Sequence, residues 1–225
     1  MAALPDHLKP IPAGREKLPR EVREEHQRAR VLAAAVDVFA EKGYPATTVD
    51  DLVAAARMGV GSFYAFFNGK EECLIAAHRQ VVAHARAVMI AAAGAAPAWP
   101  QQACLGLREL LAWVAREPAS AKVALVEIQT GGPAALGRYQ ETLSAAAEFF
   151  RRGRDLLPPS RRLPDSLEQT TVSGIAWLLH RRLAGGEADS VPALFEELGM
   201  LVLEPYLGED GAGEAVAGRA LAPNG

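Results

Sequence analysis

The sequence has few of the features that mark a secreted or membrane protein. Of its 225 residues only two are cysteines, Cys73 and Cys104, and both lie in apolar segments expected to be helical. Buried thiols in a reducing cytoplasm explain them more simply than a disulfide or a redox switch. The N-terminus lacks the apolar core of a signal peptide, and the longest apolar run, residues 87–99, is too short to span a bilayer. We therefore expect a soluble, cytoplasmic protein that does not bind membranes.

Recognisable catalytic and cofactor motifs are also absent. The sequence contains no Gly-x-Ser-x-Gly, no HExxH and no P-loop, and residues 59–62 lack the third glycine and the preceding strand of a dinucleotide fingerprint. His78 and His84 are six residues apart, which does not place them on one helix face around a shared metal ion. We predict no metal and no cofactor. An enzyme would need catalytic groups that converge from distant helices.

Positive charge, which nucleic-acid-binding proteins usually carry in excess, is scarce here. The chain has 24 Lys and Arg against 27 Asp and Glu, and residues 1–72 hold 10 basic against 11 acidic side chains. Strong nonspecific binding to DNA is therefore not expected. A local group of arginines, Lys70 and helix N-termini would still suffice to contact phosphates.

What the sequence does contain is material for helices. Aromatic residues make up only 6% of the chain, whereas half of it is hydrophobic and dominated by Ala and Leu, which favours helices over strands. We predict an all-α chain with a flexible arm over residues 1–20 and a first helical domain over residues 21–92. A second helical domain is expected over residues 98–207, followed by a flexible tail over residues 208–225.

The segment from Gly43 to Glu72 predicts two short helices joined by a tight turn. Thr48, with Asp51 three residues later, is a good N-cap for the first helix. The second helix is expected over residues 61–67, and Arg57 in the turn is expected to need a positive φ. Such a pair suits a helix-turn-helix, whose second helix enters the DNA major groove, but it suits an ordinary pair of packed helices about equally well.

Two longer helices flank this pair. The first, over about residues 20–42, should pack Leu32, Val36 and Phe39 against the pair to form a three-helix unit. The other, from residue 70 to about residue 93, should link this unit mechanically to the rest of the chain.

Four blocks, in order and at matching spacing, make residues 25–82 resemble the DNA-binding domain of TetR-family transcriptional regulators. These blocks are Phe39-Ala40-Glu41-Lys42-Gly43-Tyr44, Ala46-Thr47-Thr48-Val49-Asp50-Asp51-Leu52, Gly61-Ser62-Phe63-Tyr64-Ala65-Phe66-Phe67 and Lys70-Glu71-Glu72-Cys73-Leu74. The chain departs from the family at Arg57, where a small residue is usual, at Gly59, where Ser or Thr is usual, and at Phe66, where His or Tyr is frequent. The resemblance implies a helix-turn-helix over about residues 48–67, and a long helix leading to a C-terminal helical domain for ligand binding and dimerisation.

The resemblance also implies a function. The chain would be a sequence-specific, homodimeric DNA-binding transcriptional regulator, a repressor bound to a palindromic double-stranded operator and released by a small effector. Few charged residues are expected to point into the second domain, so we expect this effector to be largely apolar. The alternatives are a DNA-binding protein without an effector and an all-helical enzyme.

Specific residues carry these implied contacts with DNA. In a recognition helix over residues 60–67, base edges would be faced by Val60, Gly61, Ser62 and Ala65. Phosphates would be held by Tyr64, Thr48 and Lys70, and Thr47 is a further candidate for DNA contact. The alternative for Tyr64 is core packing, and for Lys70 it is a solvated helix start.

The second domain offers a candidate pocket and a candidate dimer interface. Large or polar side chains expected around its interior, each of which would also serve as plain core, are Trp113, Val126, Phe149, Trp177 and His180. Two antiparallel helices near the C-terminus have broad apolar faces, which either the rest of the chain or the same pair of a second chain must cover. The resemblance implies the second arrangement, with interface residues Ile175, Leu179, Leu194, Leu198 and Val202.

Overall fold

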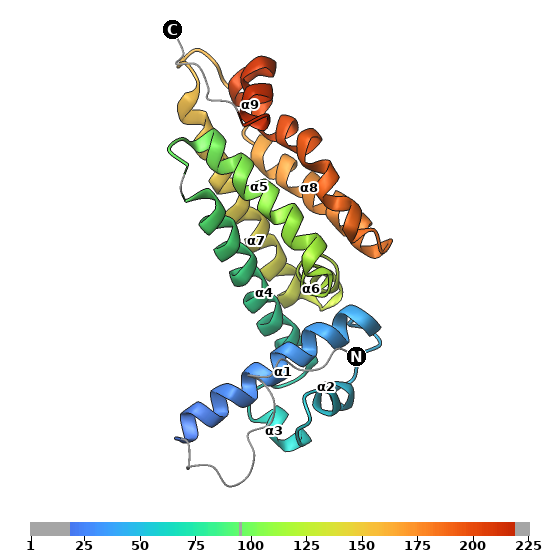
Figure 1. Ribbon diagram of the computed structural model, residues 1–225. Helices are drawn as coiled ribbons and strands as arrows, with labels where there is room; N and C mark the ends of the chain where they lie inside the picture. Colours follow the sequence, from blue (N-terminus) through green and yellow to red (C-terminus); the bar gives the residue numbers. More distant parts are fainter. Residues whose placement is uncertain (1–18, 95, 219–225) are drawn as a thin grey trace.

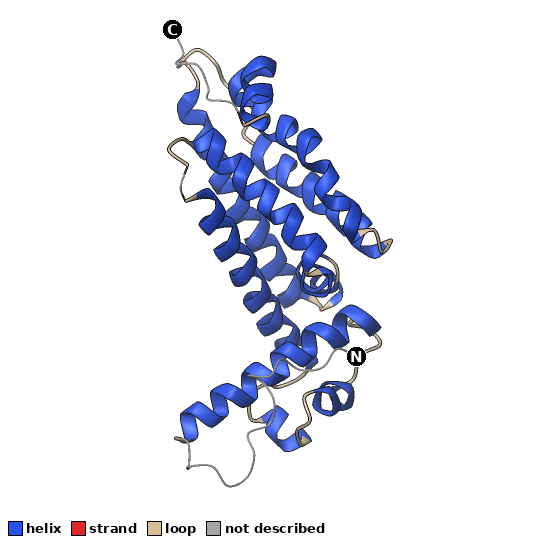
Figure 2. Cartoon of the chain, viewed as in Figure 1, coloured by secondary structure: helices blue, strands red, loops and turns tan. Residues whose placement is uncertain are grey.

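The described part of the chain is built from helices. The computed structural model describes residues 19–94 and 96–218, and no strand occurs within these ranges. No helix in the same ranges is long and apolar enough to cross a membrane. Figures 1 and 2 show a small N-terminal group of helices below a long C-terminal bundle, with α4 running from one to the other. The predicted all-α class is confirmed, whereas the predicted arm over residues 1–20 lies almost wholly outside the described residues.

The N-terminal group contains three helices and the start of a fourth. They are α1 (Arg20–Lys42), α2 (Val49–Ala55), α3 (Val60–Tyr64) and α4 (Lys70–Ala93). The ends of α1 and α4 agree with the predicted ends. The predicted packing is also confirmed, because one buried cluster includes Leu32, Val36, Phe39, Leu52, Val53, Phe63 and Phe67.

The C-terminal bundle combines long α-helices with short 3-10 turns. Its elements after α4 are α5 (Trp99–Arg116), α6 (Pro118–Leu125), η2 (Glu127–Thr130), α7 (Pro133–Arg151), η3 (Arg152–Leu156), α8 (Leu167–Ala184), η4 (Ala188–Leu194) and α9 (Phe195–Val216). Helices α4 and α5 pack along each other, as do α7 and α8 (Figure 1). Helices α6 and α7 are each followed directly by a 3-10 turn, η2 and η3.

The end of the chain differs from the prediction. Helix α9 continues to Val216, with one non-helical residue, Gly208, at φ 75°. Beyond this kink Ala212, Ala215 and Val216 are buried. A Cβ added to Gly199, near the start of α9, would lie 2.8 Å from Cγ2 of Val216, so the last turns fold back onto the first. The predicted flexible tail is therefore incorrect up to residue 218, because these apolar side chains find a surface to cover.

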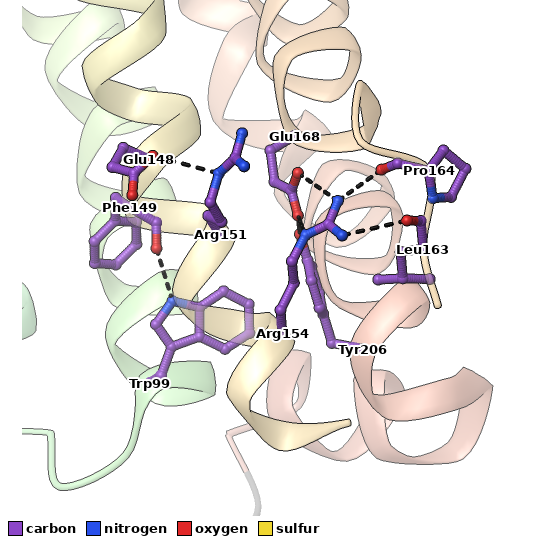
Figure 3. A network of polar contacts seen from close by, with 9 residues as sticks. All are labelled: Trp99, Glu148, Phe149, Arg151, Arg154, Leu163, Pro164, Glu168 and Tyr206. Carbon is purple, nitrogen blue, oxygen red and sulfur yellow. Dashed lines mark hydrogen bonds and ion pairs between the residues drawn. The ribbon is translucent and has the colours of Figure 1, made fainter. Parts of the chain in front are cut away.

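Figure 3 shows a network of polar contacts around a buried carboxylate of the bundle. The Glu168 carboxylate is buried and accepts hydrogen bonds from Arg154 Nε at 2.7 Å, Arg154 Nη2 at 2.9 Å and the Tyr206 hydroxyl at 2.9 Å. Burial alone would raise the pKa of Glu168, but the bonds from Arg154 and Tyr206 lower it below its ordinary value. Arg154 also donates to the carbonyls of Leu163 and Pro164. The network ties η3, α8 and α9 together.

Candidate nucleic-acid interface

The first helix of the predicted motif starts in a capping box. Asp51 N donates to Thr48 Oγ1 at 3.2 Å, and Thr48 N donates to Asp51 Oδ2 at 2.9 Å. Lys42 Nζ lies 2.7 Å from Asp51 Oδ1 and connects the box to the end of α1. The Lys42 contact and the bonds from Thr48 lower the pKa of Asp51 to about 2. The predicted N-cap is confirmed, and it fixes the direction in which α2 leaves the preceding loop.

An arginine from α1 holds the turn between α2 and α3. Arg57 has a φ of 51°, the left-handed conformation that its place in the turn predicted. Arg30 Nη2 donates to the carbonyl of Ala56 and, at 3.0 Å, to the carbonyl of Arg57. The Arg30 side chain is only 6% exposed, and burial together with the charge of Arg57 lowers its pKa. This contact leaves no local signal in the sequence, because Arg30 and Ala56 are 26 residues apart.

Helix α3 presents a short, exposed face. It spans Val60–Tyr64, less than the predicted 60–67, and continues as turns to Phe67, whose N–H bonds the Phe63 carbonyl at 3.0 Å. Phe63 and Phe67 are buried beneath it, whereas Val60 and Tyr64 are 42% and 54% exposed. Tyr64 is therefore not a core residue, and its ring meets that of Phe63 edge-on.

The other predicted base-facing residues share this helix and its end. Gly61 and Ala65 are exposed, and Ser62 is half-buried. Thr48 is exposed, with its hydroxyl 2.8 Å from Asp51 Oδ2. Their contacts with DNA stay predictions, and each of these residues keeps at least part of its surface exposed to solvent.

Two of the predicted DNA contacts are occupied by the protein itself. Thr47 is buried, and its hydroxyl donates to the Gly43 carbonyl at 2.8 Å. Lys70 Nζ lies 2.9, 3.2 and 2.8 Å from the carbonyl oxygens of Tyr44, Pro45 and Thr47. An ammonium group has three N–H donors, and here all three are directed at carbonyls. We therefore withdraw Thr47 and Lys70 as contacts to DNA, and the solvated alternative for Lys70 does not hold either.

One of the five predicted pocket residues lies outside the interior of the bundle. Trp177 is 59% exposed, with the Arg181 guanidinium 4.9 Å above its ring, so its assignment to the domain interior is corrected. Trp113 is fully buried, and its indole N–H has no partner. Val126, Phe149 and His180 are half-buried. These four residues stay candidates for effector contact.

Most of the predicted dimer-interface residues on α8 and α9 face the core of the single chain. Four of the proposed residues, Ile175, Leu179, Leu198 and Val202, are buried within the single chain and have almost no surface left for a second chain. Leu194 is half-buried. The large apolar side chains that these helices do expose are Trp177, at 59%, and Leu201, at 51%.

Within residues 19–94 and 96–218, no group of three or more His, Cys, Asp or Glu is arranged to hold a metal ion. His78 is buried in the bundle, and burial lowers its pKa to about 4. Cys73 and Cys104 are free and buried, as expected.

Comparison with known proteins agrees with this architecture. Residues 31–77, from the second half of α1 to the first turns of α4, match the family described as "Bacterial regulatory proteins, tetR family". A search of the curated proteins found no match.

Several solved structures share the fold over most of their length. The fatty acid degradation regulator FadR from Bacillus halodurans is 18% identical, with a TM-score of 0.67 over 78% of this chain and 97% of that one. The transcriptional regulator FadR from Bacillus subtilis, solved in complex with stearoyl-CoA, is 17% identical, with a TM-score of 0.67 over 80% and 98%. A TetR-like transcriptional regulator from Rhodococcus sp. RHA1 is 24% identical, with a TM-score of 0.60 over 84% and 97%. Residues 31–77 thus match the tetR family model, and the chain shares its fold with regulators described as TetR-like.

Proposed function

We propose that this chain is a homodimeric repressor that binds a palindromic operator through α3 and is released by a small, largely apolar effector. The helix-turn-helix carries the proposal. A capping box fixes α2, a buried arginine holds the turn, and α3 exposes a face without charged side chains. Such a face suits direct contact with base edges and thymine methyl groups in the major groove. We assign residues 21–92 to the DNA-binding unit and the chain from residue 98 onward to regulation and dimerisation.

Dimerisation would place two copies of α3 on successive major grooves. Two recognition helices meet successive half-sites when they lie about 34–36 Å apart. The exposed side chains Trp177 and Leu201 give α8 and α9 an apolar surface that a two-fold axis would bury. The proposed interface is therefore made by the outward faces of these helices, and their inward faces form the core of each chain.

For the effector, we propose long-chain fatty acyl thioesters as the first class to test. Two regulators with this fold over 97–98% of their length carry names or ligands from fatty acid metabolism, and one of them was solved with stearoyl-CoA. Such a ligand combines a long apolar chain with a polar end, which agrees with an effector that is largely apolar.

Selection from a random duplex library at moderate salt tests the proposal. We expect a palindrome with half-sites about one helical turn apart, and release of the bound protein on titration with stearoyl-CoA. Absence of any enriched sequence in protein freed of bound lipid would contradict the DNA-binding proposal. Enrichment without release by any acyl-CoA would support a repressor that works without this effector class.

The variant Tyr64→Phe tests the predicted phosphate contact on the selected operator. Loss of one hydrogen bond to a charged oxygen should weaken operator binding by about tenfold. The buried Tyr139 on α7 supplies the matched control, since Tyr139→Phe removes a hydroxyl far from α3. Equal affinities for the two variants would remove Tyr64 from the interface.

A further inference from the structure

The loop between α1 and α2 is bonded to the C-terminal bundle as well as to the N-terminal helices. Glu127, the first residue of η2, accepts a hydrogen bond from Tyr44 N, with 2.7 Å between N and Oε2. Glu127 is only 9% exposed. A largely buried carboxylate from the bundle therefore holds the backbone of the loop that leads into the helix-turn-helix.

Four carbonyls of this loop also accept hydrogen bonds. The Gly43 carbonyl accepts from both the backbone N–H and the hydroxyl of Thr47. The carbonyls of Tyr44, Pro45 and Thr47 all accept from Lys70 Nζ. Together with the bond from Tyr44 N–H to the carboxylate from η2, these contacts restrain the loop. It ends at the N-cap of α2, so a shift of the loop is a shift of the helix-turn-helix.

On its other side η2 is fixed to the bundle. Ile128 is fully buried, and a Cβ added to Gly131 would lie 2.5 Å from Cδ2 of Leu74, so the end of η2 packs against α4 without space to spare. The amide of Gln129 lies 3.1 Å from His180 Nδ1 on α8, the helix that also carries Trp177. A movement of α8 or α4 therefore reaches η2 directly.

We propose that Glu127 is a positioning residue for operator binding, because its carboxylate holds Tyr44 N–H and so sets the orientation of the helix-turn-helix relative to the bundle. The inference rests on the proposed function, since orientation matters when two recognition helices must fit one operator. Only the fraction of dimers with the correct separation binds, and the apparent affinity falls in proportion to that fraction. Without this bond, each helix-turn-helix samples orientations that do not fit.

Operator binding gives the first test, in the full-length dimer with the operator recovered from the library. Glu127→Ala should raise the operator Kd by about tenfold, the usual worth of a hydrogen bond to a charged acceptor. Glu127→Gln keeps an acceptor oxygen and should recover part of this loss. Glu117→Gln is the matched control, because Glu117 is also a bundle carboxylate but pairs with His84 and Ser120, away from the loop. Its Kd should stay at the wild-type value.

A distance measurement separates positioning from a general loss of stability. Spin labels at Ala54→Cys on α2 and Ser144→Cys on α7 report the orientation within one chain, diluted with unlabelled protein. Both sites are exposed, whereas the native Cys73 and Cys104 are buried and should not react. We expect a narrow distance distribution for wild type and Glu117→Gln, and a clearly broader one for Glu127→Ala well below its unfolding temperature.

The two measurements have distinct outcomes. An unchanged distance distribution in Glu127→Ala, or an operator Kd that is unchanged or lower, would overturn the role of Glu127. If the wild-type protein selected no operator, the proposed function would fail, but the distance distribution would still decide whether Glu127 orients the N-terminal unit.

Discussion

The arginine that holds the turn of the helix-turn-helix gives the sharpest test of how this interface is built. Arg30→Met removes the guanidinium and keeps most of the aliphatic stem. The Ala56 carbonyl belongs to a fully buried residue and would lose its donor, which costs about 1–3 kcal/mol. The Arg57 carbonyl belongs to an exposed residue, so water can replace much of the second bond. The variant no longer buries a charged guanidinium, which offsets part of this cost. We expect a net loss of about 2 kcal/mol in the free energy of unfolding.

The consequence for DNA binding follows from the conformation of Arg57. A left-handed conformation costs a residue with a side chain about 1–2 kcal/mol, and the bonds from Arg30 help to hold it. Without them the turn can relax and displace α3. A free-energy difference of about 2 kcal/mol corresponds to roughly 30-fold weaker operator binding.

Chemical unfolding followed by circular dichroism, and operator titration followed by fluorescence anisotropy, would measure both effects. Arg28→Met on the same helix is the matched control, because its exposed guanidinium only lies 5.7 Å from the Phe67 ring centroid. A contact of this kind is worth about 0.5–1 kcal/mol. If Arg30→Met behaved like Arg28→Met in both assays, the reasoning about the turn would be refuted.

Two further predictions concern the bundle. The pKa of buried His78 is lowered to about 4, so the unfolded chain takes up its proton first, and up to about 3 kcal/mol of stability should be lost as the pH falls from about 6.5 to 4. His78→Gln should remove this loss of stability between about pH 6.5 and 4, as measured by chemical unfolding. The control is His84→Gln, at an exposed position on the same helix. If the control flattened the pH profile equally, the assignment of this loss to His78 would be contradicted. Trp177→Glu combined with Leu201→Glu should yield monomers in sedimentation experiments, whereas the same change at the exposed Leu136 on α7 should leave the dimer intact, and a persistent dimer in the double variant would place the interface elsewhere.

The sequence predicted the features that depend on neighbouring residues. The ends of α1 and α4, the capping box at Thr48 and the positive φ of Arg57 all follow from patterns within a few residues. These are also the features that the family resemblance covers, which explains why the helix-turn-helix was the most predictable part of the molecule.

Contacts between distant segments were not predictable in this way. Arg30 meets its turn across 26 residues, and Glu127 meets Tyr44 across 83. A single sequence does not indicate which distant carboxylate and N–H group will form a hydrogen bond in the folded protein. The same reason accounts for Lys70, which looked like a phosphate ligand because its carbonyl partners lie 23 to 26 residues earlier.

The dimer interface shows a different limit. A helix that is apolar on more than one side gives no indication of which side its own chain covers. On α8 the residues Ile175 and Leu179 face inward, while Trp177, between them in sequence, faces outward. The apolar stripe was identified correctly, but it belonged to the core of the single chain.

The uncharged face of α3 has a consequence for how the proposed regulator finds its operator. This face carries no positive charge to neutralise phosphates, so the helix releases few counterions when it binds DNA. Its residues are Val60, Gly61, Ser62, Tyr64 and Ala65. Helix α3 would therefore add little to the attraction for random DNA, and sliding along the duplex would depend on basic side chains outside this helix, such as the exposed Arg28 and Arg57. The contribution of α3 to operator binding would change little with ionic strength.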